Sequence, residues 1–223
     1  AIFFPLTRNS TAGQLNVILL FCYALIGYLD SRRLPPAVGA LTAFAALFKL
    51  SPGILFLYFA WTRQWKNLKW SFAFLFLFMG ISFAFSGWAV HKNFFPVMRQ
   101  MSYGRSTWEE FGHDFYRDPF NQSLNSFFHH IMTDNPHTSP WIPLGARAAN
   151  SFTIMVSLII LAAALTSTRR AHDGNPSEEA GESYRKSAYA IFIMLSLLIP
   201  SLCWDHYFVQ ALLPMAFLLE ILY

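Results

Sequence analysis

Three ionisable residues lie inside or beside long apolar runs of this sequence. Lys49 stands in FKLSPG, and Asp205 and His206 stand together in SLCWDHYFVQ. An unpaired charge at the centre of a bilayer costs at least about 2.5–3.5 kcal/mol, so such a residue is a candidate for function. A Lys ammonium can stabilise an anion as a point charge. An imidazole whose tautomer is fixed by a carboxylate can hydrogen-bond to one.

Each candidate also has a purely structural interpretation. Lys49 could be a snorkelling side chain that marks a helix end. Asp205 could pair with Lys49 or cap the following helix, because adjacent side chains rarely face each other. The cost of charge within a membrane favours a functional role for Lys49 and His206. Asp205 fits either interpretation.

The composition indicates which elements must position these residues. The chain has 223 residues, of which 55% are hydrophobic and 13% charged, and its mean hydropathy is +0.36. A soluble domain usually has about 25% charged residues. Four windows lack Asp, Glu, Lys and Arg, and each approaches the roughly 20 residues needed to cross a bilayer: 14–29, 71–90, 148–168 and 187–204.

We therefore predict an all-α, polytopic transmembrane helical bundle that forms a single domain over residues 1–223. Its apolar segments are predicted at 14–29, 37–48/50–61, 68–90, 148–167, 187–204 and 207–223. The long stretch 91–147 is predicted to be a non-cytoplasmic loop with short amphipathic helices and with Trp88, Trp108 and Trp141 as interfacial anchors.

The segment 37–61 is interrupted at its midpoint by Lys49, Ser51 and Pro52. One tilted span would leave the ammonium near the bilayer centre, whereas two short helices meeting at Lys49 would place it near one face. With a broken pair, three short loops share one side: the loop of Arg32 and Arg33, the loop RQWKNLK, and the loop 168–186. They carry two, three and four of the sixteen Lys and Arg residues, nine in all. Basic loops of this kind are typical of the cytoplasmic side. We favour the broken pair, which puts the polar phrases of the chain on the non-cytoplasmic face.

The two ends of the chain are apolar, and the two cysteines lie within apolar runs. The chain begins with AIFFPL, which lacks the charged region and cleavage site of a signal peptide. We expect it to be a fragment of a longer membrane protein. Cys22 and Cys203 predict neither a disulfide framework nor a metal site. The loop histidines lack ligand spacing, so no metal or cofactor is expected: His91, His113, His129, His130 and His137.

Four phrases in this order resemble a known family: GQLNVILLFCYAL, LFKLSPGILFLYFAWTRQWK, FNQSL and WDHYFVQALLP. Together they are similar to glycosyltransferase family 87, within the GT-C superfamily of integral-membrane enzymes that use polyprenyl-phosphate sugars. The resemblance covers essentially the whole chain. It implies transfer of a hexose, often mannose, from a polyprenyl-phosphate donor to a lipid or glycan acceptor. The site would lie on the non-cytoplasmic face of a bacterial-type plasma membrane, among membrane lipids and without a nucleic-acid partner.

The resemblance also implies roles for particular residues. Lys49 and His206 would bind the donor phosphate, where Lys49 would stabilise the phosphate leaving group. The sugar and the pocket would be contacted by Gln14, Asn16, Asn121, Gln122 and Asp205. The family's carboxylate base lies N-terminal to the position of Gly13, so we expect it upstream of this chain and assign no catalytic residue. Four loop carboxylates offer a substitute without distinguishing one: Glu109, Glu110, Asp114 and Asp118.

Alternatives remain for both the amides and the function. Gln14 and Asn16 could simply start a helix and hydrogen-bond to neighbouring helices. Asn121 and Gln122 could make an Asx turn and an N-cap before LNSFFHHIM. A transporter or lipid-linked-sugar flippase would also explain a broken helix with a charge, but transporters usually pair two such interruptions in repeated halves. The sequence has one interruption and no evident repeat.

Overall fold

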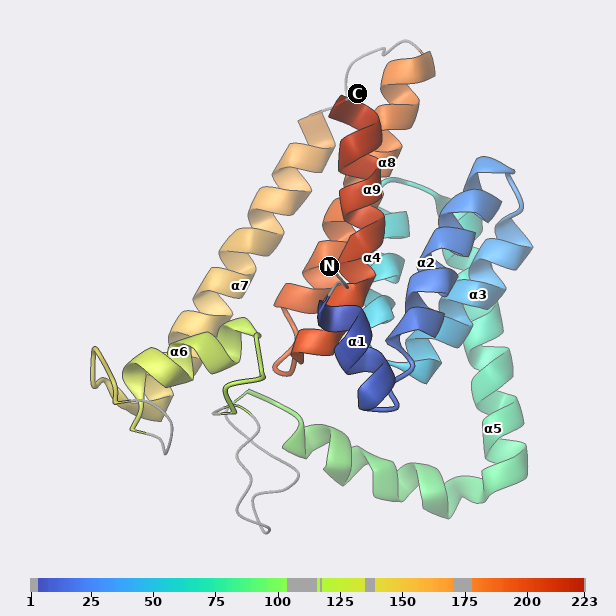
Figure 1. Cartoon of the computed structure of the whole chain (residues 1–223). Helices are drawn as coiled ribbons and strands as arrows, with labels where there is room; N and C mark the ends of the chain where they lie inside the picture. The colour runs from blue at the N-terminus through green and yellow to red at the C-terminus, as the bar shows by residue number, and fades with distance from the viewer. Residues whose placement is uncertain (1–3, 104–115, 117, 135–138, 171–177, 223) are drawn as a thin grey trace. The chain divides into compact units, whose positions relative to one another are not determined.

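The computed structural model describes residues 4–103, 116, 118–134, 139–170 and 178–222. In these ranges the regular elements are helices, and the one β contact is an isolated bridge between Asn121 and Trp204. The predicted all-α class is confirmed. The elements, shown in Figure 1, are α1 (Phe4–Thr11), α2 (Asn16–Ser31), α3 (Pro35–Phe48), the 3₁₀ helix η1 (Ser51–Gly53), α4 (Ile54–Trp61), α5 (Trp65–Gln100), α6 (Leu124–Met132), α7 (Gly145–Arg170), α8 (Glu178–Leu198), the 3₁₀ helix η4 (Asp205–Ala211) and α9 (Leu212–Leu222).

The chain folds as two compact units. The first comprises residues 1–81, 162–196 and 206–223, and the second comprises 82–161 and 197–205. The helices α5, α7 and α8 each contribute to both.

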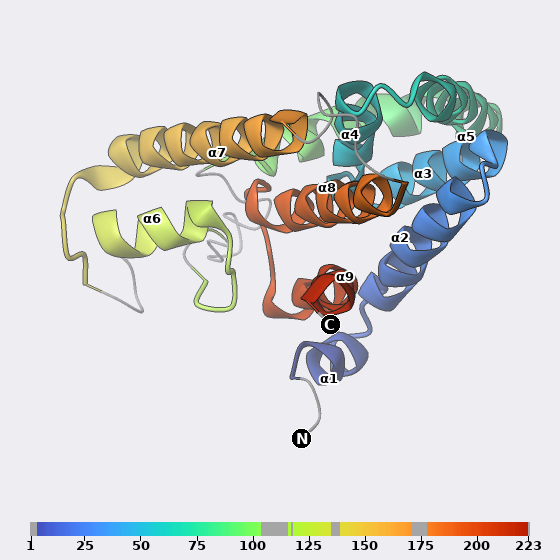
Figure 2. The same cartoon turned by 90° about the horizontal axis from the view of Figure 1, so that it is seen from above.

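In the first unit, α2 and α3 lie side by side as an antiparallel pair (Figures 1 and 2). Pro35 starts α3 where its missing N–H is not needed. Helix α5 packs so closely on α3 that a Cβ on Gly39 would lie 2.5 Å from the carbonyl carbon of Trp70 and 2.6 Å from the nitrogen of Ser71. Only a glycine permits this approach of the two backbones.

Aromatic side chains with hydrogen-bonded hydroxyls form the core of the first unit. The Tyr189 hydroxyl on α8 donates to the carbonyl oxygen of Tyr23 on α2 (2.8 Å), and the Tyr23 hydroxyl donates to Ser196 (3.2 Å). The Tyr58 ring on α4 packs against the rings of Tyr189 and Phe192, each at 5.4 Å. Burial of these rings supplies apolar area while their polar ends stay satisfied. The contacts fix α8 against α2 and α4.

The predicted interruption in 37–61 corresponds to a change of backbone geometry. Helix α3 ends at Phe48, Lys49 is extended (φ −152°, ψ 135°), and η1 precedes the start of α4 at Ile54. Pro52 explains the break, because it has no N–H to donate to the carbonyl of Phe48, four residues earlier, and its ring would clash with that carbonyl in a continuous helix. With 14 and 8 residues, α3 and α4 extend about 21 and 12 Å. Each is shorter than a bilayer core of about 30 Å.

The second unit contains the end of α5, which continues past the predicted boundary at residue 90. Helical geometry is interrupted at Gly87 (φ 73°, ψ 164°), a conformation that glycine adopts without strain. The His91 ring bridges this kink, with Nδ1 2.9 Å from the Gly87 carbonyl oxygen and Nε2 3.0 Å from the Ser82 hydroxyl. The stretch 91–147 thus includes the last turns of α5 and the amphipathic helix α6, on which Phe127 is exposed.

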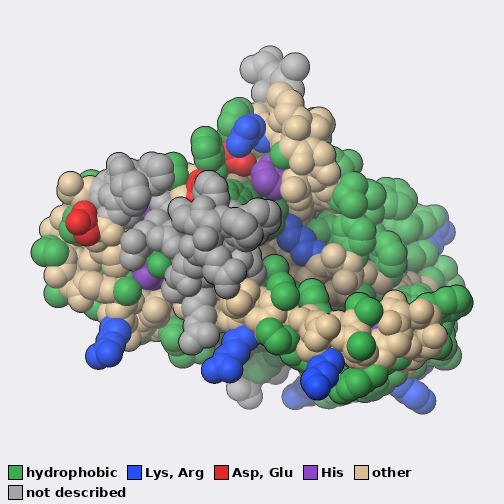
Figure 3. All heavy atoms as spheres, turned by 90° about the horizontal axis from the view of Figure 1, so that it is seen from below, with side chains coloured by type: hydrophobic (Ala, Val, Ile, Leu, Met, Phe, Trp, Pro, Cys, Tyr) green, Lys and Arg blue, Asp and Glu red, His purple; other side chains and the backbone are tan. Residues whose placement is uncertain are grey.

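Two described helices are long and apolar enough to cross a membrane, α5 and residues Gly145–Thr168 of α7. Three shorter apolar helices accompany them: Asn16–Ser31, Pro35–Phe48 and Ser51–Trp61. Hydrophobic side chains make up much of the visible surface in Figure 3, as expected of helices that face lipid. These features support membrane association.

The C-terminal segments differ from the predicted spans 187–204 and 207–223. Helix α8 ends at Leu198, and the chain becomes helical again only at Asp205, first as the 3₁₀ helix η4. Pro200 accounts for the early end, because a proline cannot continue the hydrogen-bond ladder of a helix.

Candidate functional site

Lys49 directly follows the last residue of α3, where the helix is interrupted. Its side chain therefore reaches residues of two other elements of the first unit. The Lys49 Nζ donates a hydrogen bond to the Asn16 Oδ1 at the start of α2 (2.9 Å). The same ammonium lies 2.9 Å from the centroid of the Tyr207 ring in η4. An aromatic face attracts a cation electrostatically. The ammonium is therefore held between two elements at a half-buried position.

Asn16 is buried and its amide orientation is fixed by its neighbours. Its Oδ1 accepts hydrogen bonds from Lys49 and from the Gln210 Nε2 (3.1 Å). Its Nδ2 donates to the Asn9 Oδ1 (3.1 Å), which also accepts from the Asn16 backbone N–H (3.2 Å). Since Oδ1 already accepts two bonds, Asn16 serves chiefly to position the Lys49 ammonium and the Gln210 amide.

Gln210 belongs to this cluster although the sequence analysis did not select it. It is fully buried, and its Oε1 has no hydrogen-bond partner in the part of the chain that the structure describes. A buried acceptor without a partner costs about 1–3 kcal/mol and therefore calls for a functional explanation. The available signal was an amide inside the apolar run YFVQALLP. Asn9 was missed for a different reason, because its role depends on the turn between α1 and α2.

His206 lies next to the Lys49 cluster in the first unit. It is buried at 7% exposure, and its ring contacts the Tyr207 ring edge to face at 5.0 Å between centroids. His206 and Lys49 thus both contact the Tyr207 ring. Of the two predicted phosphate ligands, one is a buried imidazole and the other a half-buried ammonium. Such a pair provides donors for an oxyanion in surroundings of low dielectric constant.

Gln14 lies apart from these contacts. It is exposed in the turn before α2, where its backbone N–H donates to the Asn9 carbonyl oxygen (2.9 Å). Of the two predicted amides in GQLN, the structure brings Asn16 to Lys49 and leaves Gln14 at the surface.

Asn121 and Gln122 belong to the second unit and have local structural roles there. The Asn121 Oδ1 accepts from the backbone N–H groups of Cys203 (2.9 Å) and Ser123 (3.2 Å), the latter an Asx turn. Its Nδ2 donates to the carbonyl oxygen of Ser201 (3.3 Å). Gln122 is exposed, and Ser123 caps α6.

Asp205, the last residue of the second unit, opens η4, and its backbone N–H donates to the carbonyl oxygen of Phe120 (3.2 Å). Together with the Asn121 bonds, this contact fastens the chain segment 119–123 to 201–205. The predicted pocket residues are therefore divided between the two units.

Several other candidates of the sequence analysis lie outside the described residues, namely Trp108, Glu109, Glu110, His113, Asp114 and His137. Among the residues that are described, no three His, Cys, Asp or Glu side chains are grouped so as to hold a metal ion. Cys22 and Cys203 are buried free thiols.

Comparison with known proteins identifies the family of this chain. The model of glycosyltransferase family 87 matches residues 1–199, which include Asn16 and Lys49 and end before His206. No curated protein and no solved structure matches the chain. The match covers most of the 223 residues and includes three of the four phrases that resemble this family, whereas WDHYFVQALLP lies beyond it. The chain belongs to glycosyltransferase family 87.

Proposed function

We propose that this glycosyltransferase moves a hexose, with mannose as the first candidate, from a polyprenyl-phosphate donor to a lipid or glycan acceptor. Family membership establishes a membrane glycosyltransferase, and hence a sugar donor and an acceptor. It also favours an enzyme over a transporter or flippase. The lipid-linked donor, the hexose and the acceptor class are the proposal.

The observation that carries the proposal is the position of the Lys49 ammonium. It is held at a helix break by Asn16 and Tyr207, beside a buried imidazole. A polyprenyl-phosphate sugar is a phosphodiester with one negative charge, and its leaving group is a phosphate monoester with up to two. A cation fixed where that charge develops stabilises the transition state more than the ground state. Lys49 fits this role.

The reaction is a substitution at the anomeric carbon of the sugar. The acceptor hydroxyl oxygen forms a bond to that carbon, and the bond from the carbon to the phosphate oxygen breaks. The electron pair leaves with polyprenyl phosphate, and the acceptor proton passes to a general base. We assign no residue of this chain as the base. Lys49 and His206 act on the leaving group only.

The remaining side chains of the first-unit cluster have supporting roles in this proposal. The Gln210 Oε1 would accept a hydrogen bond from a sugar hydroxyl, since it is buried and has no hydrogen-bond partner among the described residues. Asn16 would position Lys49. Gln14 and Asp205 stay predicted pocket residues, as do the amides of the second unit.

The proposal places this site at the non-cytoplasmic face of a bacterial-type plasma membrane. The basis is the bias of Lys and Arg toward the loops around Arg33, Lys66 and Arg185. The test is labelling of single cysteines in intact cells with a membrane-impermeant maleimide. Leu50→Cys should be labelled from outside and Arg33→Cys only after permeabilisation. The reverse pattern would refute the assigned face.

The donor class is tested with membranes that contain the full-length protein. Radiolabelled mannose is supplied either on polyprenyl phosphate or on a nucleoside diphosphate, with glucose on polyprenyl phosphate as a second hexose. We expect label to reach an extractable lipid or glycan only from the polyprenyl-phosphate donors, and fastest from the mannose donor. Transfer from the nucleoside diphosphate sugar in membranes depleted of polyprenyl phosphate would contradict the proposal.

A further inference from the structure

A cavity with charged side chains in its lining lies near the C-terminal end of α2, within the first unit. Its volume is about 530 Å³, within the range of sites for small ligands. Asp30, near the end of α2, contributes to it, whereas Asn16 begins that helix beside Lys49. Fourteen residues of helix separate the two, which corresponds to about 21 Å. The cavity is therefore distinct from the Lys49 cluster.

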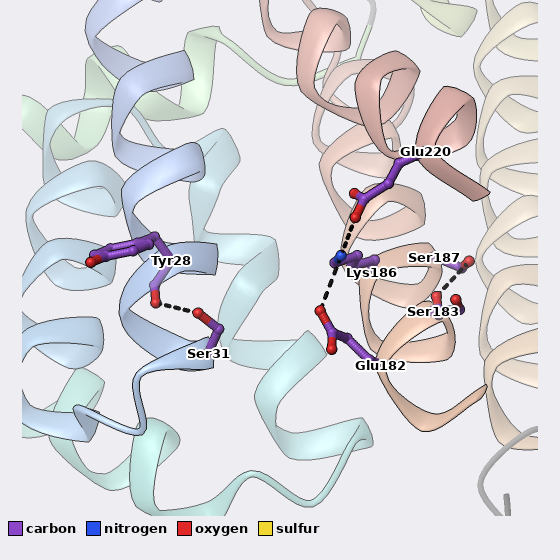
Figure 4. Close-up of polar contacts among 7 residues, drawn as sticks. All are labelled: Tyr28, Ser31, Glu182, Ser183, Lys186, Ser187 and Glu220. Carbon is purple, nitrogen blue, oxygen red and sulfur yellow. Dashed lines mark hydrogen bonds and ion pairs between the residues drawn. The ribbon is translucent and has the colours of Figure 1, made fainter. Parts of the chain in front are cut away.

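One group of charges in the cavity, Lys186 with Glu182 on α8 and Glu220 on α9, carries an excess of negative charge. Lys186 Nζ lies 2.5 Å from a carboxylate oxygen of Glu220 and 3.1 Å from one of Glu182, as Figure 4 shows. One ammonium thus serves two carboxylates, which leaves this group with a net charge of −1. Each carboxylate also keeps its second oxygen as an acceptor.

The other charged groups of the cavity carry an excess of positive charge. Asp30 accepts a hydrogen bond from the amide of Asn67 (2.7 Å), which is a neutral group. Arg33 and Arg185 line the same cavity and make no ion pair within the described part of the chain. Two guanidinium groups against one carboxylate give a net charge of +1. The cavity as a whole is neutral, and Arg33 comes from the turn after α2 whereas Arg185 lies on α8 beside Lys186.

Apolar side chains form part of the remaining lining, among them Ile26, Phe59 and Phe217. Ser31 and Tyr28 on α2 also contribute, and the Tyr28 ring points away from Lys186 in Figure 4. Apolar side chains of α9 next to the cavity are exposed, among them Leu218 (57%) and Leu219 (56%). A ligand with a zwitterionic head could therefore place hydrocarbon chains along the outer surface of this helix.

We propose that this cavity binds the headgroup of a phospholipid that carries both a phosphate and a primary ammonium, that is, an ethanolamine phospholipid. The phosphate faces Arg33 and Arg185, which can donate two parallel hydrogen bonds each. The ammonium faces the free carboxylate oxygens of Glu182 and Glu220. An anionic headgroup has no ammonium of its own to offer to Glu182 and Glu220. A choline headgroup has the right charges but no N–H to donate.

The test uses the purified full-length protein stripped of lipid in detergent. Binding of dihexanoyl phosphatidylethanolamine is measured by native mass spectrometry, beside the matching phosphatidylcholine, phosphatidylglycerol and inorganic phosphate. We expect the ethanolamine lipid to bind at least about tenfold more tightly than the other three. Equal affinity for the choline or glycerol lipid, or for phosphate alone, would overturn the proposal.

Variants identify the groups responsible. Arg33→Gln combined with Arg185→Gln should weaken binding of the ethanolamine lipid by at least about tenfold. Arg63→Gln is the matched control, because Arg63 has the same left-handed backbone (φ 56°, against 57° at Arg33) but does not line the cavity. Unchanged binding in the double variant, or an equal loss in the control, would contradict the site.

A third variant separates this site from glycosyl transfer. Lys49→Ala lies at the other end of α2 and should leave binding of the ethanolamine lipid unchanged, whatever it does to activity. A loss of lipid binding in this variant would contradict the separation of the two sites.

Discussion

Replacement of Lys49 by methionine separates the proposed chemical role of this residue from its structural one. The substitution removes the ammonium and keeps an unbranched side chain of similar length. It deletes the hydrogen bond to Asn16 and the contact with the Tyr207 ring. The Asn16 Oδ1 still accepts a hydrogen bond from Gln210, so this buried acceptor keeps a partner.

The two expected magnitudes differ widely. A hydrogen bond from a charged donor contributes about 1.5–3 kcal/mol, but Lys49 is half-buried and its ammonium also loses hydration in the folded state. We therefore expect a loss of about 1 kcal/mol, or roughly 2–4 °C in Tm for a chain of this size. Removal of one group that stabilises a developing oxyanion typically lowers kcat by about 10²–10³-fold. Lys49→Met should thus remain folded and lose most of its activity.

The assay combines initial rates of hexose transfer by the full-length enzyme with thermal unfolding in detergent. Lys69→Met, an exposed residue of a predicted cytoplasmic loop, is the matched control and should keep both its rate and its Tm. A fall in kcat of less than about fivefold in Lys49→Met would refute the role in leaving-group stabilisation. So would a fall in activity that only follows the loss of folded protein.

Three further predictions concern packing, pH and ligand contact. Gly39→Ala should lower Tm, because the added Cβ would lie 2.5 Å from the Trp70 backbone at a cost of about 1–3 kcal/mol. Gly80→Ala, with open space around it, should keep or raise Tm. Equal Tm shifts in the two variants would contradict the close packing of α5 on α3. Hydrogen bonds to two carboxylates, first that of Glu220, raise the pKa of Lys186 above its ordinary 10.5. The ion pairs of Lys186 contribute about 0.2–1 kcal/mol to stability. This contribution should be fully present below the ordinary lysine pKa of 10.5 and be lost as the pH rises through the raised pKa. The Tm difference between wild type and Lys186→Met should therefore be constant from about pH 7 to 9 and vanish in stronger alkali. Gln210→Met should keep or raise Tm, because it removes a buried acceptor without a partner, and should raise the KM for the donor; an unchanged KM would exclude Gln210 from the sugar site.

The sequence was sufficient to predict the helical class, the family and the position of the helix break. Pro52 acts on its own backbone and on the carbonyl four residues earlier, so its effect is local and can be recognised in FKLSPG. The intramembrane charge of Lys49 drew attention to the same position. Both signals depend on residues within one turn of each other.

The partners of Lys49 depend on contacts between distant parts of the chain, which a single sequence does not specify. Tyr207 contacts Lys49 and Gln210 bonds to Asn16, and both residues belong to η4, which follows the end of α8 at Leu198. The amide of Asn121 was predicted to contact the sugar, yet each of its polar atoms bonds to nearby backbone. Composition and spacing do not distinguish an amide that fastens a loop from one that faces a ligand.

The extent of α5 shows a similar limit. The sequence placed the end of this segment at residue 90, where polar residues begin. The helix continues to Gln100, because the left-handed conformation of Gly87 produces a kink after which helical geometry resumes. A glycine within an apolar run is equally compatible with a straight helix.

The central claim is that Lys49 and His206 bind the phosphate of a lipid-linked hexose donor. The most direct measurement is transfer of radiolabelled mannose from polyprenyl phosphate, in membranes that carry equal amounts of the full-length wild type or of the Lys49→Ala and His206→Ala double variant. The account predicts transfer by the wild type and a loss of at least about 100-fold in the double variant. Full activity in the double variant would contradict it.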